Sequence, residues 1–153
     1  MAATLAQILL SPTVKPLVID DCLALIEQEV SSKSGASGTA LKLAYKTAKA
    51  LASGYLRKMV RLLLPEIVEK LEPYWTEFNA SGGSAFGDYL AKRGAEVAED
   101  LVSITDEKAT ASERPAIVSA YQAIRGGATA HVEAALPQVG LLVQKYAEQA
   151  PAE

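Results

Sequence analysis

Hydrophobic residues recur along this chain with the period of α-helices. The clearest case is residues 39–64, where apolar side chains return every three or four positions and form one broad helix face. At about 1.5 Å per residue this stretch would be roughly 39 Å long, which exceeds a typical globular helix. Gly54 lies near its middle, so a break there is an open alternative, and Pro65 is expected to end the helix or start a new one.

The same pattern predicts helices on both sides of this stretch. The expected helices are residues 2–10, 16–32, 66–78, 86–105, 115–136 and 137–149. Small or polar residues predict a loop over 33–38, a turn over 79–84 and a connection over 106–114. Pro73 is expected to kink or fray its helix, and Gly126 and Gly127 to weaken theirs. The predicted fold class is therefore all-α, a compact bundle of about six or seven helices.

Two pairs of short segments indicate an internal repeat. Residues 44–49 (Ala-Tyr-Lys-Thr-Ala-Lys) resemble residues 120–125 (Ala-Tyr-Gln-Ala-Ile-Arg), and residues 60–67 resemble residues 132–139. The separation from tyrosine to proline is 20 residues in the first copy and 16 in the second, a difference close to one helical turn. We expect one all-helical domain over 1–153, with two related three-helix halves, 16–78 and 86–149, as its internal organisation.

The composition favours helical structure, and the cysteine count favours a reducing cellular compartment. Half of its 153 residues are hydrophobic and 22% are charged, with few β-branched runs. The single cysteine, Cys22, excludes an intramolecular disulfide. The first ten residues lack the features of a signal peptide, and no window approaches the length of a membrane span. We expect a cytoplasmic protein without a transmembrane segment.

Four short motifs resemble those of a known family. They are Lys33-Ser-Gly-x-Ser-Gly-Thr-Ala, Leu63-Leu-Pro65, Phe86-Gly-Asp-Tyr-Leu90 and Ala135-Leu-Pro-x-Val-Gly140. Together they are similar to an uncharacterised family of small bacterial proteins, a domain of unknown function, over nearly the whole chain. The resemblance implies a bacterial cytoplasmic protein of one domain. It implies no activity, cofactor or catalytic residue.

Charge is separated along the chain. Residues 30–65 contain seven basic and no acidic side chains, whereas the rest of the chain contains eight basic and 18 acidic ones. One interpretation is a solvated helix face that pairs with acidic helices; the other is a surface for an anionic partner or a lipid surface. Nucleic acid is not expected, because the pI is about 5.3 and no binding motif is present. The candidate binding residues are Lys42, Lys46, Lys49, Arg57 and Arg61.

Aromatic residues gather around the predicted turn at 79–84. Tyr74, Trp75 and Tyr89 belong to this group, together with two phenylalanines. A core cluster is one interpretation, and a pocket or interface patch is the other, since tyrosine and tryptophan are frequent at such sites. Arg93 lies four residues after Tyr89, where it could stack on an aromatic ring or pair with an anion.

No set of residues predicts catalysis, a metal or a cofactor. His131 is the sole histidine and has no ligand partner at metal-binding spacing. Cys22 follows Asp20 and Asp21, whose charges would raise its pKa. Glu96, Glu99 and Asp100 lack the Glu-x-x-His motif of helical di-metal sites, and residues 35–42 lack P-loop spacing. We therefore do not expect an enzyme.

Three functions remain open from the sequence. The leading hypothesis is a non-catalytic interaction protein that self-associates through apolar helix faces. The second is a binding protein for an apolar or amphiphilic anion, held in a pocket between helices near Trp75 and the basic helix. The third is peripheral association with a membrane through residues 39–64.

Overall fold

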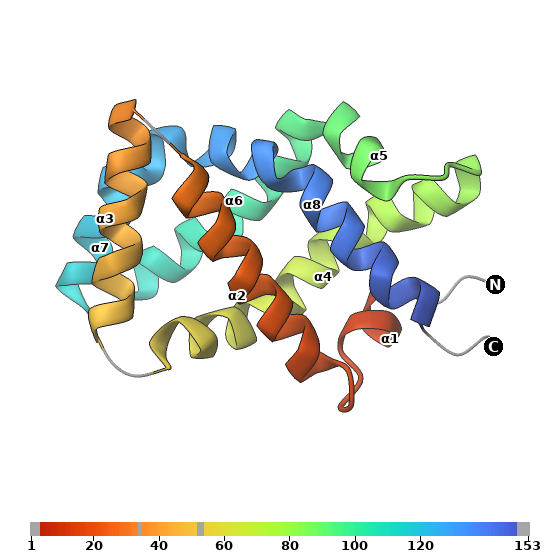
Figure 1. Cartoon of the computed structure of the whole chain (residues 1–153), viewed down its shortest axis with the longest axis horizontal. Coiled ribbons are helices and arrows are strands. Elements are labelled where there is room, and N and C mark those ends of the chain that lie inside the picture. Colours follow the sequence, from red (N-terminus) through yellow and green to blue (C-terminus); the bar gives the residue numbers. More distant parts are fainter. Residues whose placement is uncertain (1–3, 34, 52–53, 150–153) are drawn as a thin grey trace.

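The structure, a computed structural model, describes residues 4–33, 35–51 and 54–149. The described residues form eight α-helices and one 3-10 helix, which confirms the all-α fold class (Figure 1). These are α1 (Leu5–Leu9), α2 (Lys15–Ser32), α3 (Gly35–Leu51), α4 (Tyr55–Ser81), α5 (Phe86–Lys92), α6 (Gly94–Ala111), α7 (Pro115–Ile124), η1 (Arg125–Gly127) and α8 (Ala128–Gln149).

A single helix over 39–64 is wrong, and the alternative of a break at Gly54 is confirmed. Gly54 has a φ of 79°, in the left-handed region that suits glycine, and it separates α3 from α4. Residues 52 and 53 of this prediction lie outside the described residues. Pro65 was expected to end or start a helix, but it lies inside α4. Pro73 lies inside α4 as well, eight residues before its end at Ser81, and both prolines are on the exposed side of the helix. The carbonyl that each proline leaves without an amide donor therefore faces water, which donates a hydrogen bond in place of the amide.

Several other predicted boundaries are also wrong. Helix α3 begins at Gly35, so residues 35–38 of the predicted loop over 33–38 are helical, and residue 34 lies outside the described residues. Residues 86–105 form two helices that meet at Arg93, and Pro137 lies inside α8. The predicted connection over 106–114 is helical as far as Ala111. There the ammonium group of Lys108 lies 2.9 Å from a Glu66 carboxylate oxygen on α4, a contact between helices that local composition does not reveal.

Helix α4 lies at the centre of the bundle. It contacts α1, α2, α3, α5 and α6, and Figure 1 shows α2 and α8 crossing in front of it. Its buried side chains are Val60, Leu64, Val68, Leu71, Tyr74, Trp75 and Phe78. Helices α3 and α7 pack on each other at one end of the molecule, and α7 has no fully buried residue. The core thus lies around α4, and the α3–α7 pair is peripheral.

Helices α1–α4 and α5–α8 follow the same order, and we call them the first and the second unit. Helix α1 packs on α4 as α5 packs on α8, and α2 packs on α4 as α6 packs on α8. Helices α1 and α5 each begin with a buried residue whose backbone amide donates to a side chain of the long helix. The Leu5 amide donates to Glu72 Oε2 over 3.0 Å, and the Phe86 amide donates to Gln144 Oε1 over 3.0 Å. The predicted halves, 16–78 and 86–149, remain a prediction, and the first of them does not include α1.

Hydrogen bonds between the two units are matched as well. The hydroxyl of Tyr74 on α4 donates to Asp100 on α6 over 2.6 Å. The hydroxyl of Tyr146 on α8 donates to Asp21 on α2 over 2.5 Å. Tyr74 lies nine residues after Pro65, and Tyr146 lies nine residues after Pro137, so the two bonds join corresponding positions in opposite directions.

Candidate functional site

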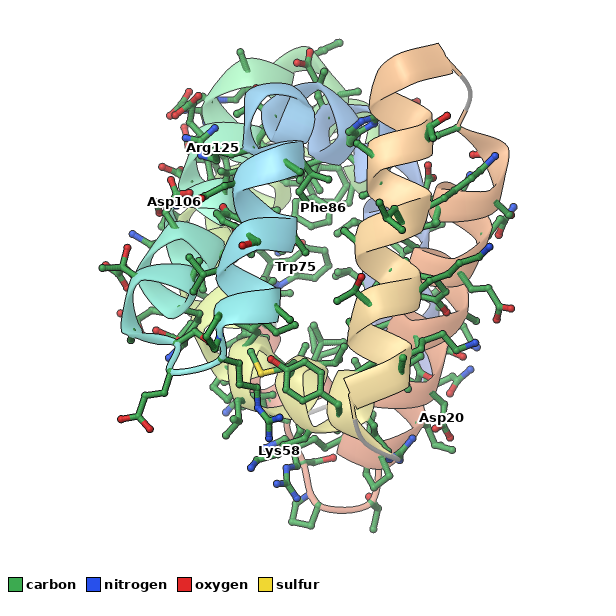
Figure 2. All side chains as sticks on the ribbon, turned by 90° about the vertical axis from the view of Figure 1, so that its left-hand side faces the viewer. Asp20, Lys58, Trp75, Phe86, Asp106 and Arg125 are labelled. Carbon is green, nitrogen blue, oxygen red and sulfur yellow. The ribbon has the colours of Figure 1, made fainter. Side chains whose placement is uncertain are left out.

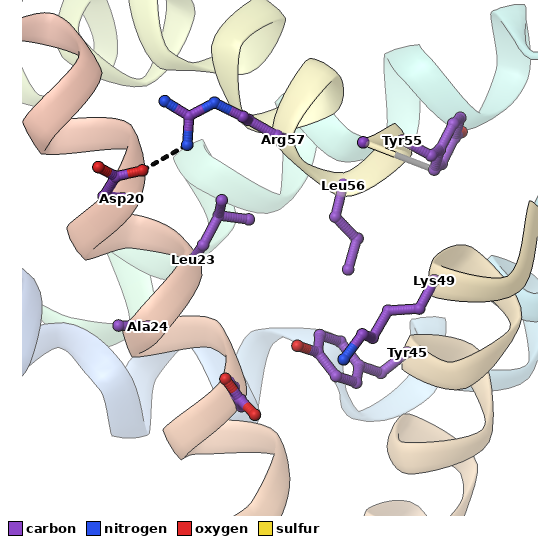
Figure 3. A pocket seen from close by; sticks show the side chains of 10 residues that line it. Asp20, Leu23, Ala24, Tyr45, Lys49, Tyr55, Leu56 and Arg57 are labelled. Carbon is purple, nitrogen blue, oxygen red and sulfur yellow. Dashed lines mark hydrogen bonds and ion pairs between the residues drawn. The ribbon is translucent and has the colours of Figure 1, made fainter. Parts of the chain in front are cut away.

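A cleft of about 470 Å³ opens between α2, the end of α3 and the start of α4 (Figure 3). Its volume lies within the range of about 300–1,000 Å³ that is typical of small-molecule pockets. The cleft is lined by Asp20, Leu23, Ala24, Glu27, Tyr45, Lys49, Gly54, Tyr55, Leu56 and Arg57.

The cleft combines an apolar surface with charged groups. Leu23 comes from α2 and Leu56 from α4, and two tyrosine rings extend this surface. At the margin, the guanidinium of Arg57 forms an ion pair with Asp20 on α2 (Figure 3). Since this pair neutralises one charge of each sign, Glu27 and Lys49 are the charged groups left to meet a ligand.

Three polar groups of the cleft have no hydrogen-bond partner among the described residues. They are the Glu27 carboxylate, the Tyr45 hydroxyl and the Lys49 ammonium. Lys49 Nζ lies 5.3 Å from the centre of the Tyr45 ring, a cation–π contact that places both side chains together on the α3 wall (Figure 3). The Glu27 carboxylate comes from α2, on another wall.

The second unit has the same three kinds of side chain at the corresponding positions, but there they are bonded to one another. Glu27 lies six residues after Asp21, and Asp106 lies six residues after Asp100. Asp21 and Asp100 are the two aspartates that accept a hydrogen bond from a tyrosine of the other unit. The Tyr121 hydroxyl donates to Asp106 Oδ1 over 2.6 Å, and Arg125 Nε donates to the same oxygen over 2.7 Å. Figure 2 labels Asp106 and Arg125, which lie near each other. We call Asp106, Tyr121 and Arg125 the closed triad.

The electrostatics of the closed triad match its hydrogen bonds. Bonds from Tyr121 and Arg125 lower the pKa of Asp106, and burial together with the Asp106 carboxylate raises the pKa of Tyr121. The carboxylate therefore stays charged and the phenol stays protonated. No comparable bonds join the corresponding groups in the described part of the first unit.

The longer tyrosine-to-proline segment of the first unit accounts for this difference. That segment spans 20 residues from Tyr45 to Pro65, against 16 from Tyr121 to Pro137. In the second unit α7 runs through η1 directly into α8, and Arg125 at this junction reaches Asp106. In the first unit α3 continues beyond Lys49, and residues 54–57 form a separate wall of the cleft.

The predicted basic residues do not all converge on the cleft. Lys42 and Lys46 are exposed on α3, and Arg61 is exposed on α4. Lys49 and Arg57 line the cleft, with Arg57 already paired to Asp20. Of the predicted basic set, Lys49 is thus the unpaired cation of the cleft.

The predicted aromatic residues form part of the core. Tyr74 and Trp75 are buried, and Trp75 packs edge to face on Phe86 with ring centres 5.0 Å apart. Tyr89 lies beside Phe78 with ring centres 5.8 Å apart. None of these residues lines the cleft, so the pocket lies away from Trp75, where the sequence had indicated one.

Arg93 is engaged by protein groups. Its guanidinium lies 4.8 Å from the centre of the Tyr74 ring, and it donates to the Tyr89 hydroxyl over 3.1 Å. It also pairs with Glu77 over 2.6 Å and with Glu96 over 2.9 Å. Hydrogen bonds to Glu77, Tyr89 and Glu96 raise its pKa. Arg93 therefore joins α4, α5 and α6 and is not available to hold an anion.

Sequence reasoning did not identify Glu27, Tyr45 or Leu56 as site residues. Tyr45 carried a signal, since it belongs to the repeated segment 44–49. Glu27 and Leu56 carried none, because they come from two helices whose proximity depends on the tertiary structure.

Comparisons with known proteins give the family of the chain. No curated protein and no solved structure matched. None of the helices within the described ranges is both long and apolar enough to cross a membrane. A family model described as a family of unknown function (DUF6918) matches residues 5–147, and the chain therefore belongs to this family.

Proposed function

We propose that this chain is a non-catalytic binding protein that holds a small molecule with an apolar body and an anionic group in the cleft between α2, α3 and α4. The observation that carries this proposal is the unpaired Lys49 ammonium and Tyr45 hydroxyl beside an apolar surface. Both groups donate hydrogen bonds, and one carboxylate or similar anionic group can accept both of these bonds. The expected setting, a bacterial cytoplasm, stays a prediction.

The charge distribution around the cleft supports an anionic group on the ligand. Helix α3 has no acidic residue, and Lys42 and Lys46 lie on it before Lys49. These exposed lysines raise the local potential and attract an anion, an effect that salt weakens. Leu23 and Leu56 then offer apolar surface, whose burial contributes about 25 cal/mol per Å².

Calorimetric titration with 3-phenylpropanoate tests this function. The probe has one carboxylate and one apolar ring, and we expect saturable binding together with a rise in melting temperature. Lys49→Gln should weaken binding about tenfold, since a charged hydrogen bond is lost. Lys42→Gln is the matched control and should cost clearly less, because Lys42 lies on the same helix but does not line the cleft and acts only through the local potential. Absence of binding, or equal losses in both variants, would contradict the proposal.

Self-association is a second candidate, and one observation favours it. Leu43 on α3 is 65% exposed, and the neighbouring α7 contains no fully buried residue. An apolar patch over these two helices would be covered by a second copy of the chain. Sedimentation velocity over a range of concentrations tests this. Leu43→Ser should lower the dimer fraction. Leu141→Ser is the control: Leu141 is exposed to a similar extent, but it lies on α8, outside the α3–α7 patch, so this variant should leave the dimer fraction unchanged.

Membrane association through residues 39–64 is not proposed. The left-handed Gly54 divides this stretch between α3 and α4, so the two parts do not form one amphipathic face. Helix α3 also packs against α7, α2 and α4, so its inner face is already in use.

A further inference from the structure

We infer that the ligand of the cleft is a zwitterion, a small molecule that has a cationic group as well as an anionic group beside its apolar body. Apolar α-amino acids are the simplest members of this class. The inference rests on the proposed function and adds to the ligand a cationic group that pairs with the Glu27 carboxylate.

The closed triad shows how a carboxylate, a phenol and a cation at these positions can satisfy one another's hydrogen bonds. In the second unit one carboxylate accepts from a phenol and a cation, so Asp106, Tyr121 and Arg125 satisfy one another. In the first unit the corresponding Glu27 and Lys49 form no ion pair with each other, and the cleft lies between the helices that bear them. Both side chains are exposed to water, so a ligand that displaces this water would supply a partner for each.

Charge balance favours a ligand with both charges over a ligand with a single charge. The Asp20–Arg57 pair is neutral, which leaves one negative group, Glu27, and one positive group, Lys49. A plain anion would pair with Lys49 but would be repelled by Glu27, and a plain cation would meet the opposite problem. A zwitterion pairs with both, and its own charges no longer need to be hydrated.

The walls of the cleft assign each part of the ligand. The carboxylate would accept from Lys49 Nζ and the Tyr45 hydroxyl on α3, and the ammonium would donate to Glu27 on α2. The apolar side chain would lie against Leu23 and Leu56. A cleft of about 470 Å³ has room for a side chain as large as a phenyl ring.

Three probes with the same ring separate the two charges. L-Phenylalanine has both charges, 3-phenylpropanoate has only the carboxylate, and 2-phenylethylamine has only the ammonium. By calorimetric titration we expect L-phenylalanine to bind at least about tenfold more tightly than either of the others. Glu27→Gln should remove its advantage over 3-phenylpropanoate, and Lys49→Gln its advantage over 2-phenylethylamine. Lys42→Gln should change neither ratio.

The outcomes distinguish this inference from the proposed function. If 3-phenylpropanoate binds as tightly as L-phenylalanine and Glu27→Gln has no effect on either, the zwitterion is excluded and the anion-binding cleft stands. If none of the probes binds, both proposals fail. If L-phenylalanine binds but neither Glu27→Gln nor Lys49→Gln weakens it, the molecule binds elsewhere and the inference is overturned.

Discussion

Tyr74 and Tyr146 occupy corresponding positions in the two units, and each hydroxyl donates a hydrogen bond to an aspartate of the other unit. Tyr74 reaches Asp100 over 2.6 Å, and Tyr146 reaches Asp21 over 2.5 Å. Burial and the neighbouring carboxylate raise the pKa of both phenols, so both stay protonated donors. The units are thus joined by two reciprocal bonds, one at each crossing of a long helix with the other unit.

Removal of either hydroxyl should destabilise the fold. We expect Tyr74→Phe and Tyr146→Phe each to lower the free energy of unfolding by about 1–2 kcal/mol, because a charged acceptor loses its donor. The two losses should add in the double variant, since the bonds share no residue. Urea denaturation measures these changes. Tyr45→Phe is the control and should be nearly neutral, and a comparable loss there would refute the assignment.

Stability should fall in acid through Asp21. Hydrogen bonds from Tyr146 and Lys145 lower the pKa of Asp21 in the folded state below its unfolded value of about 3.9. The unfolded state therefore takes up the proton first, and the contribution of Asp21 is present above that value and lost as the pH falls through the folded pKa. We expect Asp21→Asn to cost about 1 kcal/mol at neutral pH and progressively less in acid. A cost that is independent of pH would contradict this.

The crossing of α5 and α8 depends on two glycines. A Cβ atom on Gly140 would lie 2.1 Å from the Cα of Gly87, and a Cβ on Gly87 would lie 2.6 Å from the Pro137 carbonyl oxygen. Since these neighbours are backbone atoms, the helices would have to move apart. We expect Gly140→Ala to lower the free energy of unfolding by about 3 kcal/mol.

Gly126→Ala is the matched control for this crossing. A Cβ at Gly126 would meet nothing within 4 Å, and Gly126 does not have a positive φ. We expect this variant to be neutral or stabilised by up to about 1 kcal/mol, because alanine lowers the entropy of the unfolded chain. Urea denaturation measures both variants. Equal effects of the two substitutions would show that the close approach of α5 and α8 is not the reason why position 140 needs glycine.

The thiol of Cys22 should be unreactive in the folded protein. Burial, followed by the charge of Asp21, raises the pKa of Cys22 to about 11, so little thiolate forms at pH 8. We expect a chromogenic aromatic disulfide reagent to label the folded protein at least about a hundredfold more slowly than the urea-unfolded protein. Similar rates in both states would contradict the raised pKa of this half-buried thiol.

Sequence reasoning predicted the helical class correctly but placed many helix ends wrongly. Apolar spacing is a local property, so it revealed the helical period around Leu71 and Val97 without any knowledge of the fold. Pro65, Pro73 and Pro137 were expected to interrupt or bound helices, yet all three lie within them. Water and tertiary packing outweigh the local cost of a proline at such exposed positions.

The candidate site was predictable only in part, for the same reason. The lysines of α3 were visible as an acid-free stretch, and Lys49 does line the cleft. Arg93 had the same formal charge, but only the structure shows that Glu77 and Glu96 already neutralise it. The formal charge of a residue is known from the sequence. Whether that residue is free to bind a ligand depends on which charged side chains the fold places next to it.

The sequence by itself determined the helical class, the segregation of basic residues into 30–65 and the repeated segments, including their difference of four residues. These are properties of order and spacing along one chain. Only the tertiary structure decided that this difference leaves Glu27, Tyr45 and Lys49 around an open cleft, whereas Asp106, Tyr121 and Arg125 bond to one another. A hydrogen bond needs its two groups within about 3 Å, and the packing of distant helices sets that distance.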